Sequence, residues 1–108
     1  MNQQEIIGNA VKFQNLEIAE NDFPNQMDWP SAINVCTQLG EGWRLPTKKE
    51  LQQMFKNQEK IGGFTRLDYW SSTEGVNTEL AWFKNFFKGE NATFKRFSCR
   101  VRAVRDIV

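Results

Sequence analysis

The sequence predicts a single α+β domain in which one strand is followed by two helices and then by several antiparallel strands. Two observations support this order. Apolar residues recur at helical spacing between residues 29 and 55, and from residue 69 onward they form short, aromatic, β-prone runs. The chain has 108 residues, the length of one domain, and folding can bury one core without metals. We therefore expect one domain over residues 1–108, with residues 1–9 as a loosely ordered lead-in.

The N-terminal strand is predicted within residues 11–18. Val11 and Phe13 alternate with polar residues, and Leu16 and Ile18 continue the pattern out of phase, so we expect a strand with an irregularity in its middle. Asn-Asp and Phe-Pro-Asn sequences then predict a loop over residues 21–26.

The first long helix is predicted to begin after Asp28, a good N-cap, with Pro30 tolerated in its first turn. Its apolar residues fall on one face: Trp29, Ala32, Ile33, Cys36 and Leu39. Gly40 is the expected stop, and Gly42 allows the chain to reverse toward the second helix.

The second helix is predicted over residues 48–57, and its start is the best-defined point in the chain. Pro46 has no amide proton and favours an extended residue before it, so a helix cannot continue through it. Thr47 and Glu50 have the spacing of a capping box, in which each side chain accepts a hydrogen bond from the other residue's backbone amide. One apolar stripe then follows along the helix.

The remaining strands are predicted at residues 69–73, 80–87, 92–97 and 99–104. The second and third of these form a hairpin around a turn at residues 88–91. In the last strand the apolar residues at odd positions are expected to face the core, which leaves Arg100 and Arg102 on the opposite face.

Several residues are expected to have structural roles: Trp29, Cys36, Trp43, Arg44, Pro46, Thr47, Glu50 and Trp70. Arg44 lies between two residues that we expect to be buried, so its guanidinium should pair with a carboxylate or with carbonyls near a helix end. Trp70 is predicted to enter the core, while the hydroxyls of Ser71 and Ser72 bond backbone groups where the strand ends.

Composition argues against most catalytic and cofactor chemistry. The chain has no histidine, no glycine-rich phosphate loop and no cysteine cluster, so we expect no enzymatic activity, no metal and no cofactor. A net charge of +1 does not indicate a nucleic-acid partner, and no apolar run is long enough for membrane insertion. The N-terminus lacks the basic region of a signal peptide. We therefore expect a cell-surface or secreted location only as part of a longer precursor, and otherwise a cytoplasmic or phage-associated one.

Charge is distributed unevenly along the chain. Up to residue 41 the only cation is Lys12, against six carboxylates, and 13 cations follow. We favour the interpretation that the two halves pack together and their charges pair. The alternative is a basic face on the C-terminal strands.

A series of motifs follows in characteristic order: Met-Asp-Trp at 27–29 with Ala32 and Cys36, Leu-Gly at 39–40, Gly-Trp-Arg-Leu-Pro-Thr at 42–47, Glu-Leu at 50–51, Ile-Gly-Gly-Phe at 61–64, Tyr-Trp-Ser-Ser-Thr-Glu at 69–74, Ala-Trp at 81–82, Gly89, Lys95 and Val-Arg-Ala-Val-Arg at 101–105. Over residues 10–105 the chain resembles the bacterial domain family of unknown function that includes the C-terminal domain of collagen-like adhesins and the Fibrobacter major paralogous domain. The resemblance implies a C-type-lectin-like fold: two helices packed on a twisted antiparallel sheet, with the N- and C-terminal strands paired.

Three departures from related proteins limit what the resemblance implies. The paired catalytic cysteines of the sulfatase-modifying enzymes have no counterpart, and the calcium-ligand motifs of true C-type lectins are absent, with only four oxygen-bearing side chains in the loop at residues 74–79. The last-strand cysteine of related lectin-like folds corresponds to Ala103. A Cys36–Cys99 bridge is therefore less expected than two free thiols.

One binding hypothesis remains, a basic and aromatic surface on the C-terminal hairpin, with the neighbouring loop at residues 74–79. Its predicted ligand-binding residues are Trp82, Lys84, Phe86, Lys88, Lys95, Arg96, Arg100 and Arg102. Guanidinium groups pair with sulfate or carboxylate and aromatic rings stack on sugar faces, so a sulfated or acidic glycan would suit it. The competing interpretation is an ordinary solvated sheet face.

The function that we predict is a non-enzymatic lectin-like binding module for a carbohydrate or a protein surface. The alternative is a structural or assembly domain of a phage or cell-surface appendage, in which exposed Phe86 or Phe87 would enter a homo-oligomer interface. A sulfatase-modifying type of enzyme ranks third, because the cysteine pair is missing.

Overall fold

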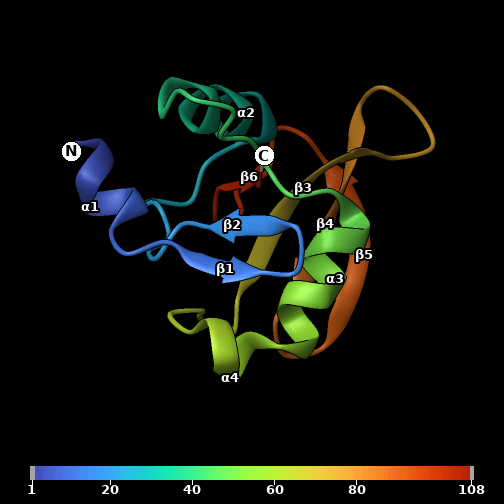
Figure 1. The fold of residues 1–108 in the computed structure, drawn as a ribbon. Coiled ribbons are helices and arrows are strands. Elements are labelled where there is room, and N and C mark those ends of the chain that lie inside the picture. Colours follow the sequence, from blue (N-terminus) through green and yellow to red (C-terminus); the bar gives the residue numbers. More distant parts are fainter. Residues whose placement is uncertain (1, 108) are drawn as a thin grey trace.

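The domain consists of two small antiparallel sheets with helices packed against them (Figure 1). The computed structural model describes residues 2–107, and their elements run in the order α1 (Gln3–Ile7), β1 (Val11–Phe13), β2 (Leu16–Ile18), α2 (Trp29–Gln38), α3 (Lys48–Lys56), α4 (Gln58–Ile61), β3 (Asp68–Glu74), β4 (Leu80–Asn85), β5 (Gly89–Phe94) and β6 (Val104–Asp106). The predicted α+β class is confirmed, and the two predicted long helices correspond to α2 and α3.

The first sheet has the order β1-β2-β6 and joins the two ends of the domain. β2 pairs antiparallel with both neighbours, and Ile18 lies opposite Val104, so the expected pairing of N- and C-terminal strands is confirmed. The single irregular strand predicted over residues 11–18 is wrong. The chain reverses at Gln14 and Asn15 to form a hairpin, because Gln14 adopts a φ of 53° that turns the backbone.

The second sheet has the order β3-β4-β5 and contains the predicted C-terminal hairpin. β4 ends at Asn85, two residues earlier than predicted. The Asn85 side-chain oxygen accepts hydrogen bonds from the backbone amides of Phe87 and Lys88, and these bonds start the turn directly after Asn85. The turn therefore directs Phe86 into the core instead of along the strand.

Residues 99–103 lie between the two sheets and do not form the continuous strand predicted there. Cys99 bridges to Met27, and the Arg100 carbonyl accepts the amide of Trp70. Further along, Val101 and Ala103 accept amides from the segment at residues 19–23. Residues 99, 101 and 103 therefore bond the segment at residues 19–27, while residue 100 bonds β3, so this stretch connects both sheets without joining either ladder.

The two long helices each cover a different cluster of buried residues. α2 buries Ala32 and Cys36 with Trp70 and Val101, whereas α3 buries its apolar stripe against a second cluster around Tyr69. The predicted start of α2 is confirmed, since the Asp28 carboxylate accepts the amide of Ser31.

α1 occupies part of the lead-in expected at residues 1–9. Its Ile6 side chain is buried in the core, and the carbonyls of Ile6 and Ile7 accept the amides of Asn21 and Glu20. Residues 3–7 are therefore packed against the body of the domain.

Both cysteines are free and buried. Burial raises the pKa of the Cys36 thiol to about 12, and burial together with the nearby negative charge of Asp68 raises that of Cys99 to about 12. Such thiols are protonated at neutral pH and act as small apolar residues. The expectation of two free thiols is confirmed.

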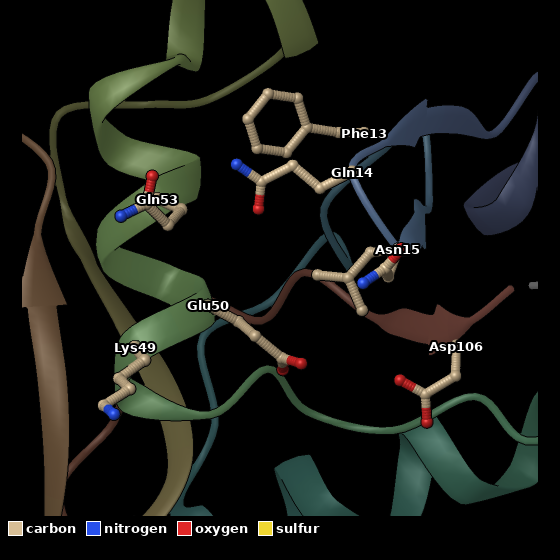
Figure 2. Close-up of a pocket in the computed structure, with 8 residues that line it drawn as sticks. Phe13, Gln14, Asn15, Lys49, Glu50, Gln53 and Asp106 are labelled. Carbon is tan, nitrogen blue, oxygen red and sulfur yellow. The ribbon is translucent and has the colours of Figure 1, made fainter.

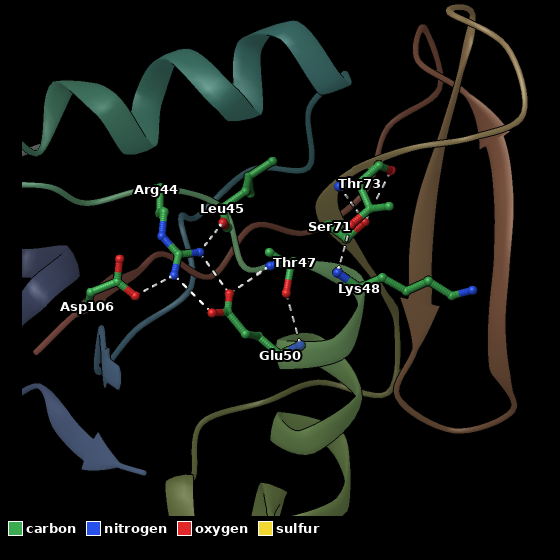
Figure 3. Close-up of polar contacts among 8 residues, drawn as sticks. All are labelled: Arg44, Leu45, Thr47, Lys48, Glu50, Ser71, Thr73 and Asp106. Carbon is green, nitrogen blue, oxygen red and sulfur yellow. Dashed lines mark hydrogen bonds and ion pairs between the residues drawn. The ribbon is translucent and has the colours of Figure 1, made fainter. Parts of the chain in front are cut away.

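The start of α3 carries the polar network that orients this helix (Figure 3). The predicted capping box is present: the Thr47 hydroxyl accepts the amide of Glu50, and the Glu50 carboxylate accepts the amide of Thr47. The Arg44 guanidinium donates hydrogen bonds to both Glu50 carboxylate oxygens, at 2.7 and 2.9 Å, and also to Asp106 on β6. The Lys48 amide donates to the Thr73 hydroxyl on β3, so the helix start is tied to both sheets. Arg44 thus has its predicted structural role.

This network predicts that Glu50→Gln destabilises the domain in a pH-dependent way. Burial alone would raise the pKa of the Glu50 carboxyl, but the hydrogen bonds from Arg44 and from the Thr47 amide outweigh it and hold the pKa below its usual range. A lowered folded-state pKa gives stability that is present above the unfolded-state value of about 4.3 and is lost as pH falls through the folded value. We expect a loss of about 1–2 kcal/mol at pH 7 by chemical denaturation.

Repeating the titration from about pH 7 to pH 2 should bring Glu50→Gln and wild type together at the acidic end. Glu59→Gln, at an exposed position on α4, is the matched control and should follow wild type throughout. A Glu50→Gln deficit that stays constant over this range would contradict the assigned role of the carboxylate.

Candidate functional site

The exposed end of β5 carries a guanidinium held between two aromatic rings. Phe94 and Phe97 meet edge to face with ring centroids 5.8 Å apart, and the Arg96 guanidinium carbon lies 4.4 Å and 5.2 Å from these centroids. The Phe97 amide donates to the Phe94 carbonyl, so a tight turn brings the rings together. Both rings are exposed, at 38% and 49%, and Arg96 makes no ion pair with any described residue.

A second cation–aromatic pair lies on the same face of the sheet. Trp82 is directly opposite Ala92 and Leu80 is opposite Phe94, so Trp82 and Phe94 are diagonal neighbours on one face. The Lys48 ammonium, from the first turn of α3, lies 3.5 Å from the Trp82 ring centroid. Lys48 was missed by the sequence analysis, because 34 positions separate it from its ring.

We call these five residues the aromatic-cationic patch: Lys48, Trp82, Phe94, Arg96 and Phe97. α3 brings one cation to the patch and the turn after β5 brings the other, and α3 packs across this part of the sheet (Figure 1). Two cations and three partly exposed rings on one face form a surface that can hold an anionic ligand with apolar faces.

Lys95, although predicted to bind ligand, makes its contacts within the domain. Its ammonium group lies 2.6 Å from a Glu74 carboxylate oxygen and 4.3 Å from the Trp29 ring centroid. Its carbonyl accepts the Trp29 amide, and the Trp29 indole donates to the Ser71 carbonyl. Lys95 therefore fastens the start of α2 to the hairpin.

The placement of Arg102 on a ligand-binding face is wrong. Arg102 is 1% exposed, and its guanidinium bonds Asp22 at 2.7 Å and the carbonyls of Ala19, Gly62 and Gly63. Strand alternation does not predict exposure here, because residues 101–103 are all buried.

Lys84 and Phe86 are also misplaced in the predicted surface, being 8% and 2% exposed. α3 covers this face of β4, and the Lys84 ammonium lies 4.4 Å from the Phe55 ring centroid. Phe86 turns inward at the closed end of the hairpin and packs on Phe64 and Tyr69.

Arg100 and Lys88 lie away from the patch. Arg100 is half-buried and donates to the Pro24 carbonyl, while its Nε is buried without a partner in the described part of the chain. Lys88 is exposed beside a recess of about 380 Å³ at the turn of the hairpin, the opposite end of β5 from Arg96. The eight predicted residues therefore do not form one surface.

Arginines of the last segment form ion pairs with carboxylates of the acidic N-terminal half. Arg105 pairs with Glu17 and Glu41, and Arg102 pairs with Asp22, so acidic residues of the N-terminal half neutralise the last segment. The favoured interpretation of the uneven charge is confirmed for this segment. The loop at residues 74–79 provides no metal cluster, since no group of three metal-ligating side chains occurs among the described residues.

Comparison with known proteins first defines the class. The structure is similar to the crystal structure of botrocetin, with a TM-score of 0.70 over 94% of this chain and 98% of that one at 11% sequence identity. At this identity the likeness shows the fold alone, and the fold is C-type-lectin-like.

The family is defined by sequence. A model of the Lcl C-terminal domain matches residues 9–105, so the chain belongs to the Lcl C-terminal domain family. A search of curated proteins finds no match. The match begins after α1, which therefore precedes the family's shared region. No helix within residues 2–107 has both the length and the apolar character needed to cross a membrane.

The buried position of Arg102 predicts a large stability loss for Arg102→Met. The substitution leaves the Asp22 carboxylate, with its side chain 11% exposed, and three carbonyls without their guanidinium partner, which should cost about 3–5 kcal/mol. Arg96→Ala removes the same charge from an exposed position and should change stability by less than about 0.5 kcal/mol. Denaturant titration of both variants checks this, and equal, small effects would show that Arg102 is not a core residue.

Proposed function

We propose that the protein is a non-enzymatic binding module that recognises an acidic, preferably sulfated, carbohydrate at the aromatic-cationic patch. The observation that supports this most is Arg96, exposed, unpaired among the described residues and fixed over two exposed rings. A planar guanidinium suits the paired oxygens of sulfate or carboxylate, and aromatic rings offer flat apolar contact to sugar C–H faces.

The spacing within the patch favours a chain of sugars over a single small anion. Trp82 and Phe94 are diagonal neighbours, and each ring has its own cation. Such a pair lies roughly 7–8 Å apart between Cα atoms, so one extended ligand can contact both rings and both cations. A single sulfate ion reaches only one of them. A protein ligand with acidic side chains is the alternative within the same class.

Retention on immobilised heparin tests this proposal. We expect Arg96→Ala and Lys48→Ala each to weaken heparin binding about tenfold, because each removes one charge-assisted contact worth roughly 1.4 kcal/mol. The matched control is Lys60→Ala, which removes the same charge from an exposed position on α4.

Comparison of heparin with its chemically desulfated form separates sulfate recognition from general charge attraction. Wild type should prefer the sulfated chain, and Arg96→Ala should lose most of that preference. Equal losses in Arg96→Ala and Lys60→Ala would indicate a diffuse charge effect and contradict a site at the patch. Retention of an acidic peptide but not of heparin would favour the protein ligand.

An assembly role is the second candidate, favoured by one feature. Phe87 is 60% exposed at the turn of the hairpin, with Leu67 41% exposed near it and the Arg66 guanidinium 5.1 Å from its ring. Of the two rings predicted for an oligomer interface, Phe86 is buried and only Phe87 is available. Sedimentation of wild type and Phe87→Ser distinguishes the roles: self-association that Phe87→Ser abolishes would support assembly.

A further inference from the structure

A recess lies between α3 and the β1–β2 turn (Figure 2), and none of its lining residues belongs to the aromatic-cationic patch. It has a volume of about 350 Å³, within the range of small-molecule sites. The β1–β2 turn contributes Phe13, Gln14 and Asn15 on one side, and α3 contributes Gln53 on the other. In the close-up the Gln14 amide and the Phe13 ring extend across the space toward α3.

The side chains around this recess offer hydrogen-bonding groups that the fold does not use. No hydrogen bond within residues 2–107 involves the side-chain amides of Gln14, Asn15 or Gln53, and each amide both donates and accepts. On β6, one Asp106 oxygen accepts from Arg44, and the other makes no hydrogen bond to a described residue. Free amides beside an apolar ring are suited to a ligand that has many hydroxyl groups.

The charges around the recess balance. Lys49, Glu50 and Asp106 line the recess, and Arg44 binds both carboxylates from beside it. The Glu50 oxygens are both taken by Arg44 and by the amide of Thr47, so they do not attract a cation. A charged ligand would therefore meet its own sign as well as the opposite one, whereas an uncharged polar ligand meets no repulsion.

The β1–β2 turn, which borders the recess, contains a residue in an unfavourable backbone conformation. Gln14 is a non-glycine residue with a φ of 53°, at the first of two hairpin-turn positions, where glycine fits without steric strain. Strained backbone of this kind is concentrated at binding sites. A glycine here would relax the turn but would remove the group that extends over the recess.

We propose that this recess binds one uncharged pyranose ring, with Phe13 against its C–H face and the three amides and Asp106 bonding its hydroxyl groups. The site is independent of the acidic-glycan proposal, because it shares no residue with the aromatic-cationic patch. A ligand of this size in an open recess should bind with millimolar affinity.

Titration of the ¹⁵N-labelled full chain by NMR tests the proposal, with methyl α-mannopyranoside, methyl β-galactopyranoside and N-acetylglucosamine as probes. At least one should shift the side-chain amide signals of Gln14, Asn15 and Gln53 at millimolar concentrations. Glucuronate and glucosamine, the charged counterparts, should bind several-fold more weakly.

Two variants separate a binding role from a structural one. Gln14→Gly and Gln53→Ala should each weaken the sugar-induced shifts at least fivefold, while Gln14→Gly raises or preserves the melting temperature. Gln52→Ala, on the same helix but outside the recess, should bind as wild type. Heparin binding should be unchanged in both variants, and Arg96→Ala should leave the sugar-induced shifts intact.

The proposal is overturned if none of the three uncharged sugars shifts these amides, or if the shifts map to the aromatic-cationic patch. It is also overturned if Gln14→Gly and Gln53→Ala bind like wild type, or if a charged sugar binds more tightly than every uncharged one. None of these results bears on heparin retention, so the two sites succeed or fail separately.

Discussion

The domain is organised around one buried guanidinium. Arg102 bonds Asp22, the Ala19 carbonyl and two carbonyls of the loop after α4, so it joins the N-terminal half, the middle loop and the C-terminal segment. The Tyr69 hydroxyl also donates to Asp22, and burial and the Asp22 carboxylate raise the pKa of Tyr69 to about 12, which keeps this donor protonated. Gly63 is required at this point: its φ is +79°, and a Cβ there would lie 3.0 Å from the guanidinium and 3.1 Å from the Glu20 carbonyl.

This arrangement decides which cations reach the surface. Arg44, Arg102 and Arg105 are held by carboxylates from other parts of the chain, and a half-buried or buried guanidinium with several hydrogen bonds is not available to a ligand. Of the cations that remain beside exposed or partly exposed rings, Lys48 comes from the start of α3, Arg96 from the turn after β5 and Arg66 from the loop before β3. Part of the basic character of the C-terminal half therefore stabilises the fold, and Lys48 and Arg96 supply the cations of the patch.

Sequence patterns predicted the features that depend on neighbours along the chain. They failed where contacts with distant segments determine the burial of a side chain. The N-cap at Asp28 and the capping box at Thr47 and Glu50 are set by spacings of three residues, so they could be predicted. Strand alternation placed Arg102 in solvent, because nothing local shows that distant segments enclose residues 101–103. The early turn at Asn85 could have been found, since asparagine often bonds the amides two and three positions on. Lys48 could not, because its contact with Trp82 exists only after α3 packs on β4.

Both candidate sites depend on the rotational phase of α3. Each residue advances a helix by about 100°, so residues 51 and 54 face the core, residue 48 faces the hairpin, and residues 49, 50 and 53 face the β1–β2 turn. The rotational phase of α3 is fixed where the helix begins, at Pro46 and the Thr47 cap. The hydrogen bonds from Arg44 to Glu50 then stabilise it. A start displaced by one residue would turn Lys48 away from Trp82 and Gln53 away from Gln14 at once. The capping box therefore supports both proposed sites as well as the helix, even though neither of its residues needs to contact a ligand.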